Sequence, residues 1–220
     1  MNSDKTKIIV FCKRKGKKKS DFRYNGNILE VVDEFRYLGV VFNYKGTFKE
    51  CQNDIKSKAN RAIFALLSKG RKLNLPVDIM LELFDKTILP ILLYGSEVWG
   101  YEKYQALDCV YLRYCKYLFG LKQSTPNCMI YGETGRYPVH IHITFRIINY
   151  WLKITRSHES KINKKLYDIA RSKYENGINV TKWIEFVRNT LFKNGFEYVW
   201  IQQAENINVN QFKAAFKERM

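Results

Sequence analysis

Several features that mark other protein classes are scarce or missing in this sequence of 220 residues. Its five cysteines are odd in number and include no C-x-x-C pair, which argues against a disulfide framework and indicates thiols in a reducing compartment. No apolar run is long enough to span a membrane, because Pro90 interrupts the longest candidate, Thr87–Gly95. The apolar run near Met1 is too short for a secretory signal. We therefore expect a protein of the nucleus or cytoplasm that is not secreted.

Acidic residues are also in short supply. The chain has 38 Lys and Arg against 21 Asp and Glu, a formal net charge of +17. The first 20 residues hold eight Lys and Arg against one Asp, and no acidic residue occurs from Ile55 to Val77. This basic excess predicts a polyanionic partner, either nucleic acid or an anionic membrane surface. Since no segment is suited to a membrane, we expect nucleic acid and no membrane partner.

Strand-like patterns dominate the first 46 residues. Apolar or alternating runs occur at Ile8–Phe11, Phe22–Tyr24, Ile28–Val32 and Phe35–Phe42. They predict hairpins of one small sheet. Gly39, inside the last run, predicts a bulge or a close approach of the backbone.

Helical patterns dominate after Gly46. Apolar residues recur every three or four positions from Ile55 to Leu67, and Gly70 is a plausible end for that helix. Pro76 and Pro138 stand at helix starts, and further helical spacing continues to the C-terminus. We predict an α+β protein that is mostly α, with N-terminal β-hairpins, a helical bundle and further C-terminal helices.

Six sequence blocks occur in a fixed order over residues 2 to 156. They are N-x-x-K-T-K before an apolar strand (2–11), F-R-Y-L-G-V-V-F (35–42), I-x-x-K-A-x-x-A (55–62), L-P-I-L-L-Y-G-S-E-V-W (89–99), S-T-P-N-x-x-I-Y-G-E-T-G-R-Y-P (124–138) and N-Y-W-L-K-I (149–154). In this order they resemble the C-terminal part of the reverse transcriptases of non-LTR, LINE-like retrotransposons.

The resemblance implies three parts. Residues 1–46 would be a palm remnant with a basic hairpin and a primer-grip-like hairpin, 47–123 a thumb-like helical bundle, and 124–220 a C-terminal helical region. The strand near Met1 resembles the return strand of a palm, so we expect the fingers and the active-site strands to lie upstream.

The chemistry of such a polymerase depends on carboxylates. Two Mg²⁺ ions held by acidic side chains activate the primer hydroxyl and stabilise the leaving pyrophosphate. No Asp-Asp pair occurs in this sequence, and Asp33-Glu34 is more consistent with a solvated strand edge. We therefore predict no catalytic residues, no metal site and no cofactor in this chain, and no polymerase activity by it alone. Mg²⁺ is expected for the intact polymerase.

The candidate nucleic-acid-binding residues come from three segments. The basic run could bind phosphates, act as a nuclear import signal or keep a hairpin tip soluble. The resemblance places the Tyr-Leu-Gly turn near the primer end, and the helix cations would meet phosphates unless they are simply the solvated face of an amphipathic helix. The candidates are Lys13, Arg14, Lys15, Lys17, Lys18, Lys19, Tyr37, Leu38, Gly39, Lys56, Lys58, Arg61 and Lys69.

Weaker signals have simpler explanations. His140 and His142 could bind a metal from a strand, but no Cys or acid stands at ligand spacing, so unmetallated histidines are favoured. Asp54-x-Lys56 faintly resembles a nuclease motif without its Pro-Asp partner. Four aromatic residues could stack on bases, although helical spacing favours core positions: Tyr114, Tyr117, Tyr150 and Trp151.

The sequence therefore predicts a fragment of an RNA-directed DNA polymerase that keeps its nucleic-acid-binding segments. Its partners would be an RNA template, an RNA–DNA hybrid or a duplex, and the missing palm and fingers. An alternative is a helical interaction module whose segment Leu89–Trp99 offers an exposed apolar patch to a protein partner. A decayed open reading frame without selected function is a third possibility.

Overall fold

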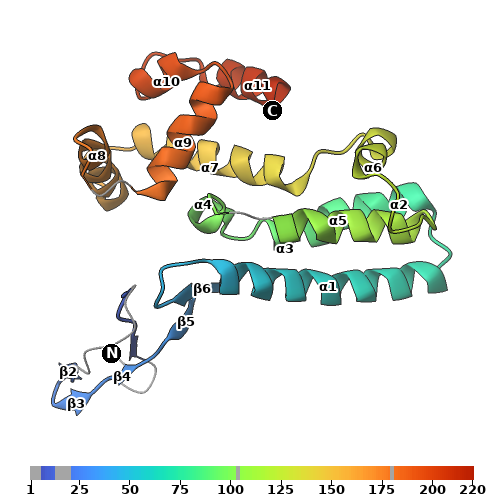
Figure 1. Cartoon of the computed structure of the whole chain (residues 1–220), viewed down its shortest axis with the longest axis horizontal. Helices are drawn as coiled ribbons and strands as arrows, with labels where there is room; N and C mark the ends of the chain where they lie inside the picture. Colours follow the sequence, from blue (N-terminus) through green and yellow to red (C-terminus); the bar gives the residue numbers. More distant parts are fainter. Residues whose placement is uncertain (1–5, 13–20, 103–104, 179–180) are drawn as a thin grey trace. The chain divides into compact units, whose positions relative to one another are not determined.

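The computed structural model describes residues 6–12, 21–102, 105–178 and 181–220. Most of these residues are helical, and a few short strands occupy the N-terminal part (Figure 1). The predicted class, α+β and mostly α, is confirmed. The chain forms two compact units, the first from Met1–Tyr94 and Tyr104–Ile130 and the second from Gly95–Lys103 and Tyr131–Met220. The three-part division made from the sequence stays a prediction.

The N-terminal strands do not form the single sheet expected from the sequence. They make three separate two-stranded sheets, of which one is parallel and two are antiparallel. The pairs are β1 (Lys7–Ile8) with β4 (Glu30–Val31), β2 (Arg23–Tyr24) with β3 (Asn27–Ile28), and β5 (Glu34–Tyr37) with β6 (Val40–Asn43). Every residue of β2 and β3 is exposed, so neither strand has the buried face that fixes a wider sheet.

The longest helix of the first unit is α1 (Lys49–Lys72), with 24 residues. It contacts β6, α3 (Leu89–Leu92) and α5 (Gln105–Leu118). Its predicted apolar stripe is confirmed at Ile55 and Ala59, which are buried. On the facing helix Leu107, Val110 and Tyr114 are buried, while Leu118 is half-buried. Burial of these two stripes makes the core of this unit.

Gly70 does not end α1, contrary to the expectation. The helix continues to Lys72, and Asn74 adopts the left-handed conformation that follows its end, with φ 47°. Gly70 is buried, and a Cβ added to it would lie 2.3 Å from the sulfur of Met80 in α2 (Val77–Leu83). The missing side chain therefore gives room to Met80, and the glycine serves packing rather than termination.

Pro90 changes the helix before it rather than ending it. After α2 the chain takes a π-helical turn, η2 (Phe84–Ile88), and then continues as α3 with Pro90 at its start. Proline has no N–H to donate, and its ring displaces the carbonyl of the preceding turn. Phe84 and Ile88 stay buried in this widened turn, so the change of helix type does not remove these side chains from the core.

The second unit is built around α7 (Val139–Thr155), which is helical from its first residue. Its fully buried side chains include Ile143, Ile147 and Trp151, and it contacts α4, α8 and α9. The remaining helices of the described residues are α4 (Ser96–Trp99), α6 (Asn127–Thr134), α8 (Ile162–Glu175), α9 (Lys182–Lys193), α10 (Glu197–Ile201) and α11 (Val209–Arg219), and α6 crosses the boundary between the two units. Across the residues that are described, none of the helices combines the length and apolarity required to cross a membrane.

Buried hydrogen bonds connect α7, α8 and the turn after α10 in the second unit. The indole N–H of Trp151 donates to the hydroxyl of Tyr167, 2.9 Å away, and that hydroxyl donates to the side-chain oxygen of Gln203, 2.5 Å away. Burial of Tyr167 raises the pKa of its hydroxyl to about 12, although the hydrogen bond from Trp151 opposes the shift. The hydroxyl is therefore neutral and satisfied on both sides.

Candidate nucleic-acid interface

The predicted Tyr-Leu-Gly segment is the tip of the hairpin between β5 and β6. Leu38 and Gly39 are its two turn residues, with φ 46° and 83°, and Tyr37 pairs with Val40 on either side of them. Two consecutive positive φ angles define the two-residue turn that matches the twist of a hairpin. The expected bulge inside one long strand is therefore wrong. Tyr37 and Leu38 are 59% and 74% exposed, so the turn presents two apolar side chains to solvent.

Tyr94 contacts this turn through its hydroxyl and its ring. Its hydroxyl donates a hydrogen bond to the carbonyl oxygen of Leu38, with 2.7 Å between the two oxygens. A Cβ added to Gly39 would lie 2.9 Å from a ring carbon of Tyr94. The space beside Gly39 is thus taken by the tyrosine ring.

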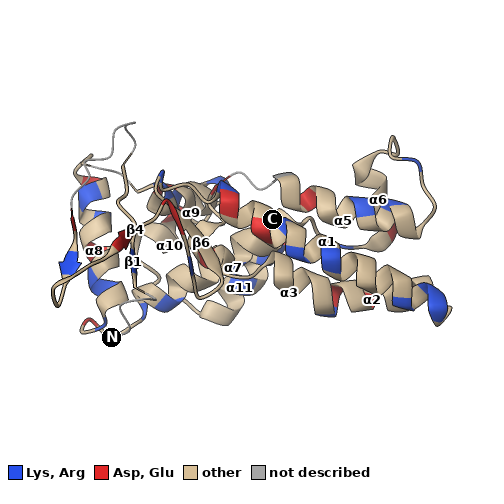
Figure 2. Cartoon of the chain, turned by 90° about the horizontal axis from the view of Figure 1, so that it is seen from below, with Lys and Arg blue, Asp and Glu red and all other residues tan. Residues whose placement is uncertain are grey.

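The basic residues of α1 do not all share one side of the helix. Positions three, four, seven or eleven apart lie on one face, which brings Lys58, Arg61 and Lys69 together with Lys72. Lys56 precedes Lys58 by two positions and therefore lies about 160° away around the helix. Figure 2 colours these cations along α1. We call Lys58, Arg61, Lys69 and Lys72 the basic face of α1.

Asp54 begins that face and joins it to the hairpin. Its carboxylate accepts two hydrogen bonds from the Arg36 guanidinium of β5, at 2.8 and 2.7 Å, and lies 2.8 Å from the ammonium of Lys58. The hydrogen bond from Arg36 is the main reason why the pKa of Asp54 is lowered, and Lys58 adds to the effect. Asp54 therefore forms ion pairs with Arg36 and Lys58, and neither cation is the Lys56 of the Asp54-x-Lys56 pattern.

The C-terminal end of α1 carries Lys69, Arg71 and Lys72 in its last turn. Cations at this end complement the partial negative charge of the helix terminus. That interaction offers a purely stabilising role for Lys69 and Lys72, and it does not apply to Arg61 in the middle of the helix. A measurement of binding can separate the two roles.

The remaining candidates lie away from the basic face of α1 or outside the described residues. The basic run Lys13, Arg14, Lys15, Lys17, Lys18 and Lys19 lies outside the described residues. His140 and His142 are on helix α7 and not on a strand. Of the aromatic candidates, Tyr114 and Trp151 are core residues, Tyr150 packs its ring edge-to-face with Trp183, and Tyr117 is 47% exposed.

Nothing in the described part of the chain resembles a two-metal centre. No group of three or more His, Cys, Asp or Glu side chains is close enough together there to hold a metal ion. Glu34 instead accepts a hydrogen bond from Asn43 at 2.9 Å. The residues that are described therefore do not fit the Mg²⁺ ions that an intact polymerase would bind.

The segment Leu89–Trp99 does not form the expected apolar patch. Leu92, Leu93 and Trp99 are buried, which leaves Tyr94 and Val98 as its exposed large apolar side chains. An interaction through a continuous apolar surface of this segment is therefore not supported, because its largest side chains already pack within the protein.

No protein-family model matches this chain, and the comparisons with curated proteins and with solved structures also give no match. The resemblance to retrotransposon reverse transcriptases consequently depends on the ordered sequence blocks alone and stays a prediction. The structure adds Arg36 and Tyr94, which were not among the candidates. Both residues lie within quoted blocks, but nothing local in the sequence pairs Arg36 with Asp54 or Tyr94 with Leu38.

Proposed function

We propose that this chain is a C-terminal fragment of the RNA-directed DNA polymerase of a non-LTR retrotransposon, and that it binds nucleic acid without sequence specificity. The basic face of α1 carries the proposal, because it presents four cations on one side of a helix with no acidic residue after Asp54. The resemblance supplies the family, and the charge pattern supplies the binding.

The length of the basic face suits a nucleic-acid backbone. From Lys58 to Lys72 the helix rises about 21 Å, because fourteen steps of about 1.5 Å separate them, and this length corresponds to about six nucleotides at about 3.4 Å per nucleotide. Cations spread over that length can contact successive phosphates of one strand. Phosphate contacts of this kind carry affinity and no sequence information, so the predicted partner is an RNA–DNA hybrid, a duplex or a template strand.

The hairpin tip would add contacts at one end of the same unit. Asp54 connects Arg36 of β5 with Lys58 of α1, so the hairpin and the start of the basic face are fixed to each other by a bidentate ion pair. Tyr37 and Leu38 are exposed at the tip. They can make apolar contacts with sugars or bases where the nucleic-acid strand extends beyond the basic face of α1.

The test is fluorescence anisotropy with a labelled RNA–DNA hybrid of about 20 base pairs, long enough to exceed the face about threefold. We expect binding that weakens steeply with salt and does not change when the sequence is scrambled. Absence of binding at low salt contradicts the proposal. Salt-insensitive self-association in the same samples would instead favour a protein-interaction module.

A further inference from the structure

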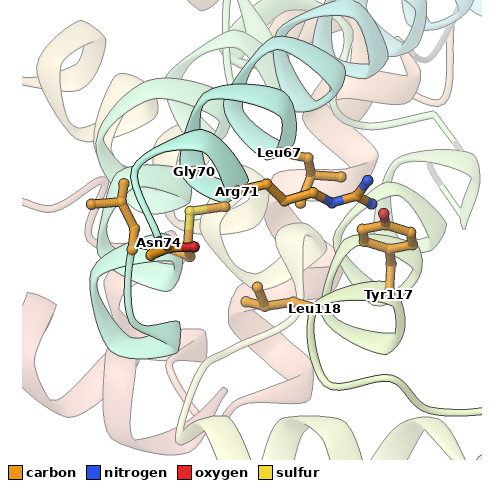
Figure 3. A pocket seen from close by; sticks show the side chains of 8 residues that line it. Leu67, Gly70, Arg71, Asn74, Tyr117 and Leu118 are labelled. Carbon is orange, nitrogen blue, oxygen red and sulfur yellow. The ribbon is translucent and has the colours of Figure 1, made fainter.

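An open groove lies in the first unit at the C-terminal end of α1 (Figure 3). Its volume of about 580 Å³ falls within the range of small-molecule sites, about 300–1,000 Å³. Residues from α1, α2 and α5 and from the connection after α1 line it. They include the apolar Leu67, Met80 and Leu118 and the polar Arg71, Asn74 and Tyr117.

Two planar groups lie together at the groove. The guanidinium carbon of Arg71 is 4.9 Å from the centre of the Tyr117 ring, as a cation–π contact requires (Figure 3). Both side chains are exposed, although Tyr117 belongs to a helix whose other aromatic residues, Tyr111 and Tyr114, are buried. Aromatic rings and arginine planes are the side-chain surfaces on which unpaired nucleobases stack.

The charge around the groove favours an anion. Not one of the eight residues lining it is acidic, and Arg71 stands between the basic residues Lys69 and Lys72 in the last turn of α1. A ligand with a flat apolar part and a negatively charged part fits this combination. A nucleotide has both, because its base can lie against the apolar and planar side chains of the groove while its phosphate lies near Lys69 and Lys72.

We infer that this groove binds one unpaired nucleotide of a single strand, with the base against Tyr117 and Arg71 and the backbone near the last turn of α1. The inference depends on the proposed function, since it adds a base-binding subsite to the basic face of α1. A paired base is already stacked and cannot enter, so the subsite distinguishes a single strand or a frayed end from a duplex.

The experiment compares two probes with equal numbers of phosphates. One is a twelve-nucleotide single strand of deoxyadenosine, and the other is the same strand with abasic sites at every position. Stacking contributes about 1–3 kcal/mol per base, so the full-length chain should prefer the base-bearing strand by roughly 5- to 150-fold. Affinities are read from competition against a labelled strand at constant salt.

Three variants locate that preference. Tyr117→Ala should remove most of it, whereas Tyr117→Phe keeps the ring and should retain it. Arg71→Lys keeps the positive charge but loses the planar group, so it should reduce the preference and leave the salt dependence unchanged. Tyr198→Ala in α10 is the matched control, because that tyrosine is 50% exposed, close to the 47% of Tyr117, and lies in the other unit.

The outcomes separate the inference from the proposed function. Equal, salt-dependent affinity for both probes would overturn the base-binding groove and leave phosphate binding intact. A preference that survives both Tyr117→Ala and Arg71→Lys would place base recognition elsewhere and also overturn the groove. No binding of either probe by the wild-type chain contradicts both proposals. Loss of the preference in these two variants, and not in Tyr198→Ala, supports the groove.

Discussion

The hydroxyl of Tyr94 donates a hydrogen bond to the carbonyl oxygen of Leu38, 56 positions earlier in the chain. This bond fixes the exposed hairpin turn to the segment that follows α3. Leu38 has a positive φ of 46°, a conformation that costs a leucine free energy and needs support from its surroundings. Tyr94 provides that support through its hydroxyl, and its ring fills the space beside Gly39.

Substitution of Gly39 tests how close this contact is. We expect Gly39→Ala to destabilise the first unit more than Gly26→Ala. The two glycines have nearly equal φ angles, 83° and 81°, so they differ mainly in the space that a new Cβ would enter. A Cβ at Gly39 meets Tyr94 at 2.9 Å, whereas a Cβ at Gly26 meets nothing within 4 Å. The conformational cost of about 1 kcal/mol is common to both variants. Urea unfolding should show an additional loss of about 1–2 kcal/mol for Gly39→Ala, and equal losses would contradict the contact.

Removal of the carboxylate at Asp54 should strengthen binding of nucleic acid. Asp54→Asn releases Arg36 and Lys58 from their shared partner, so both cations become available to phosphates. The slope of log K against log salt should become steeper by the equivalent of up to about two phosphate contacts. Glu205→Gln, which removes one negative charge from the second unit, controls for the change in net charge. The same effect from both variants would mean that Arg36 and Lys58 do not belong to the interface.

Acid should also weaken the link between the hairpin and α1. The pKa of Asp54 is lowered in the folded chain, chiefly by the hydrogen bond from Arg36. A lowered folded pKa means that this carboxylate stabilises the fold above its unfolded pKa of about 3.9, and that the contribution is lost as pH falls through the folded value. Acid unfolding of Asp54→Asn should lack this component. Identical acid transitions in both proteins would contradict it.

Tyr167 predicts a change of stability at the alkaline end. Its folded pKa of about 12 lies above the ordinary value of 10, so stability from this group is complete below pH 10 and is lost as pH rises toward 12. The loss between about pH 9.5 and 11.5 should be about 2 kcal/mol. Tyr167→Phe should lack this step, and at neutral pH it should cost about 1–3 kcal/mol because Trp151 and Gln203 lose their partner.

Denaturant unfolding of wild type and Tyr167→Phe near neutral pH measures the cost of losing the hydroxyl. The same measurement at about pH 9.5 and 11.5 gives the loss of stability with pH. The difference between the two proteins isolates this hydroxyl, since all other tyrosines and lysines titrate in both. A variant that loses stability with pH as steeply as the wild type would show that Tyr167 ionises normally.

Local sequence patterns predicted the helices well and their surroundings less well. The stripe from Ile55 gave the register of α1, and Pro76 and Pro138 stand immediately before α2 and α7, because apolar spacing and proline geometry act within one turn. The helical spacing expected toward the C-terminus includes Ile162, Leu166 and Ile169, which lie in α8, yet these three side chains are exposed. Periodicity identifies a helix, but partners distant in sequence decide which side is buried.

The glycines and the charged pairs show the same limit. Gly70 and Gly39 were assigned from their neighbours in sequence, whereas Met80 and Tyr94 determine their roles from 10 and 55 positions away. The contact between Arg36 and Asp54 crosses from a strand to a helix and leaves no local signal. For the candidate site, the sequence therefore identified the basic helix, whereas the structure showed that Leu38 and Gly39 form a turn and that Lys56 lies apart from the other three cations.

The slope of log K against log salt for binding of the RNA–DNA hybrid tests the basic face of α1 most directly. The triple variant with Lys58→Ala, Arg61→Ala and Lys69→Ala should make that slope shallower than in the wild type. The change should be equivalent to about two to three phosphate contacts. The control variant Lys165→Ala, Lys173→Ala, Lys217→Ala removes the same charge from exposed positions of the second unit and should leave the slope nearly unchanged. Equal slopes for the wild type and the α1 variant would contradict binding by this face.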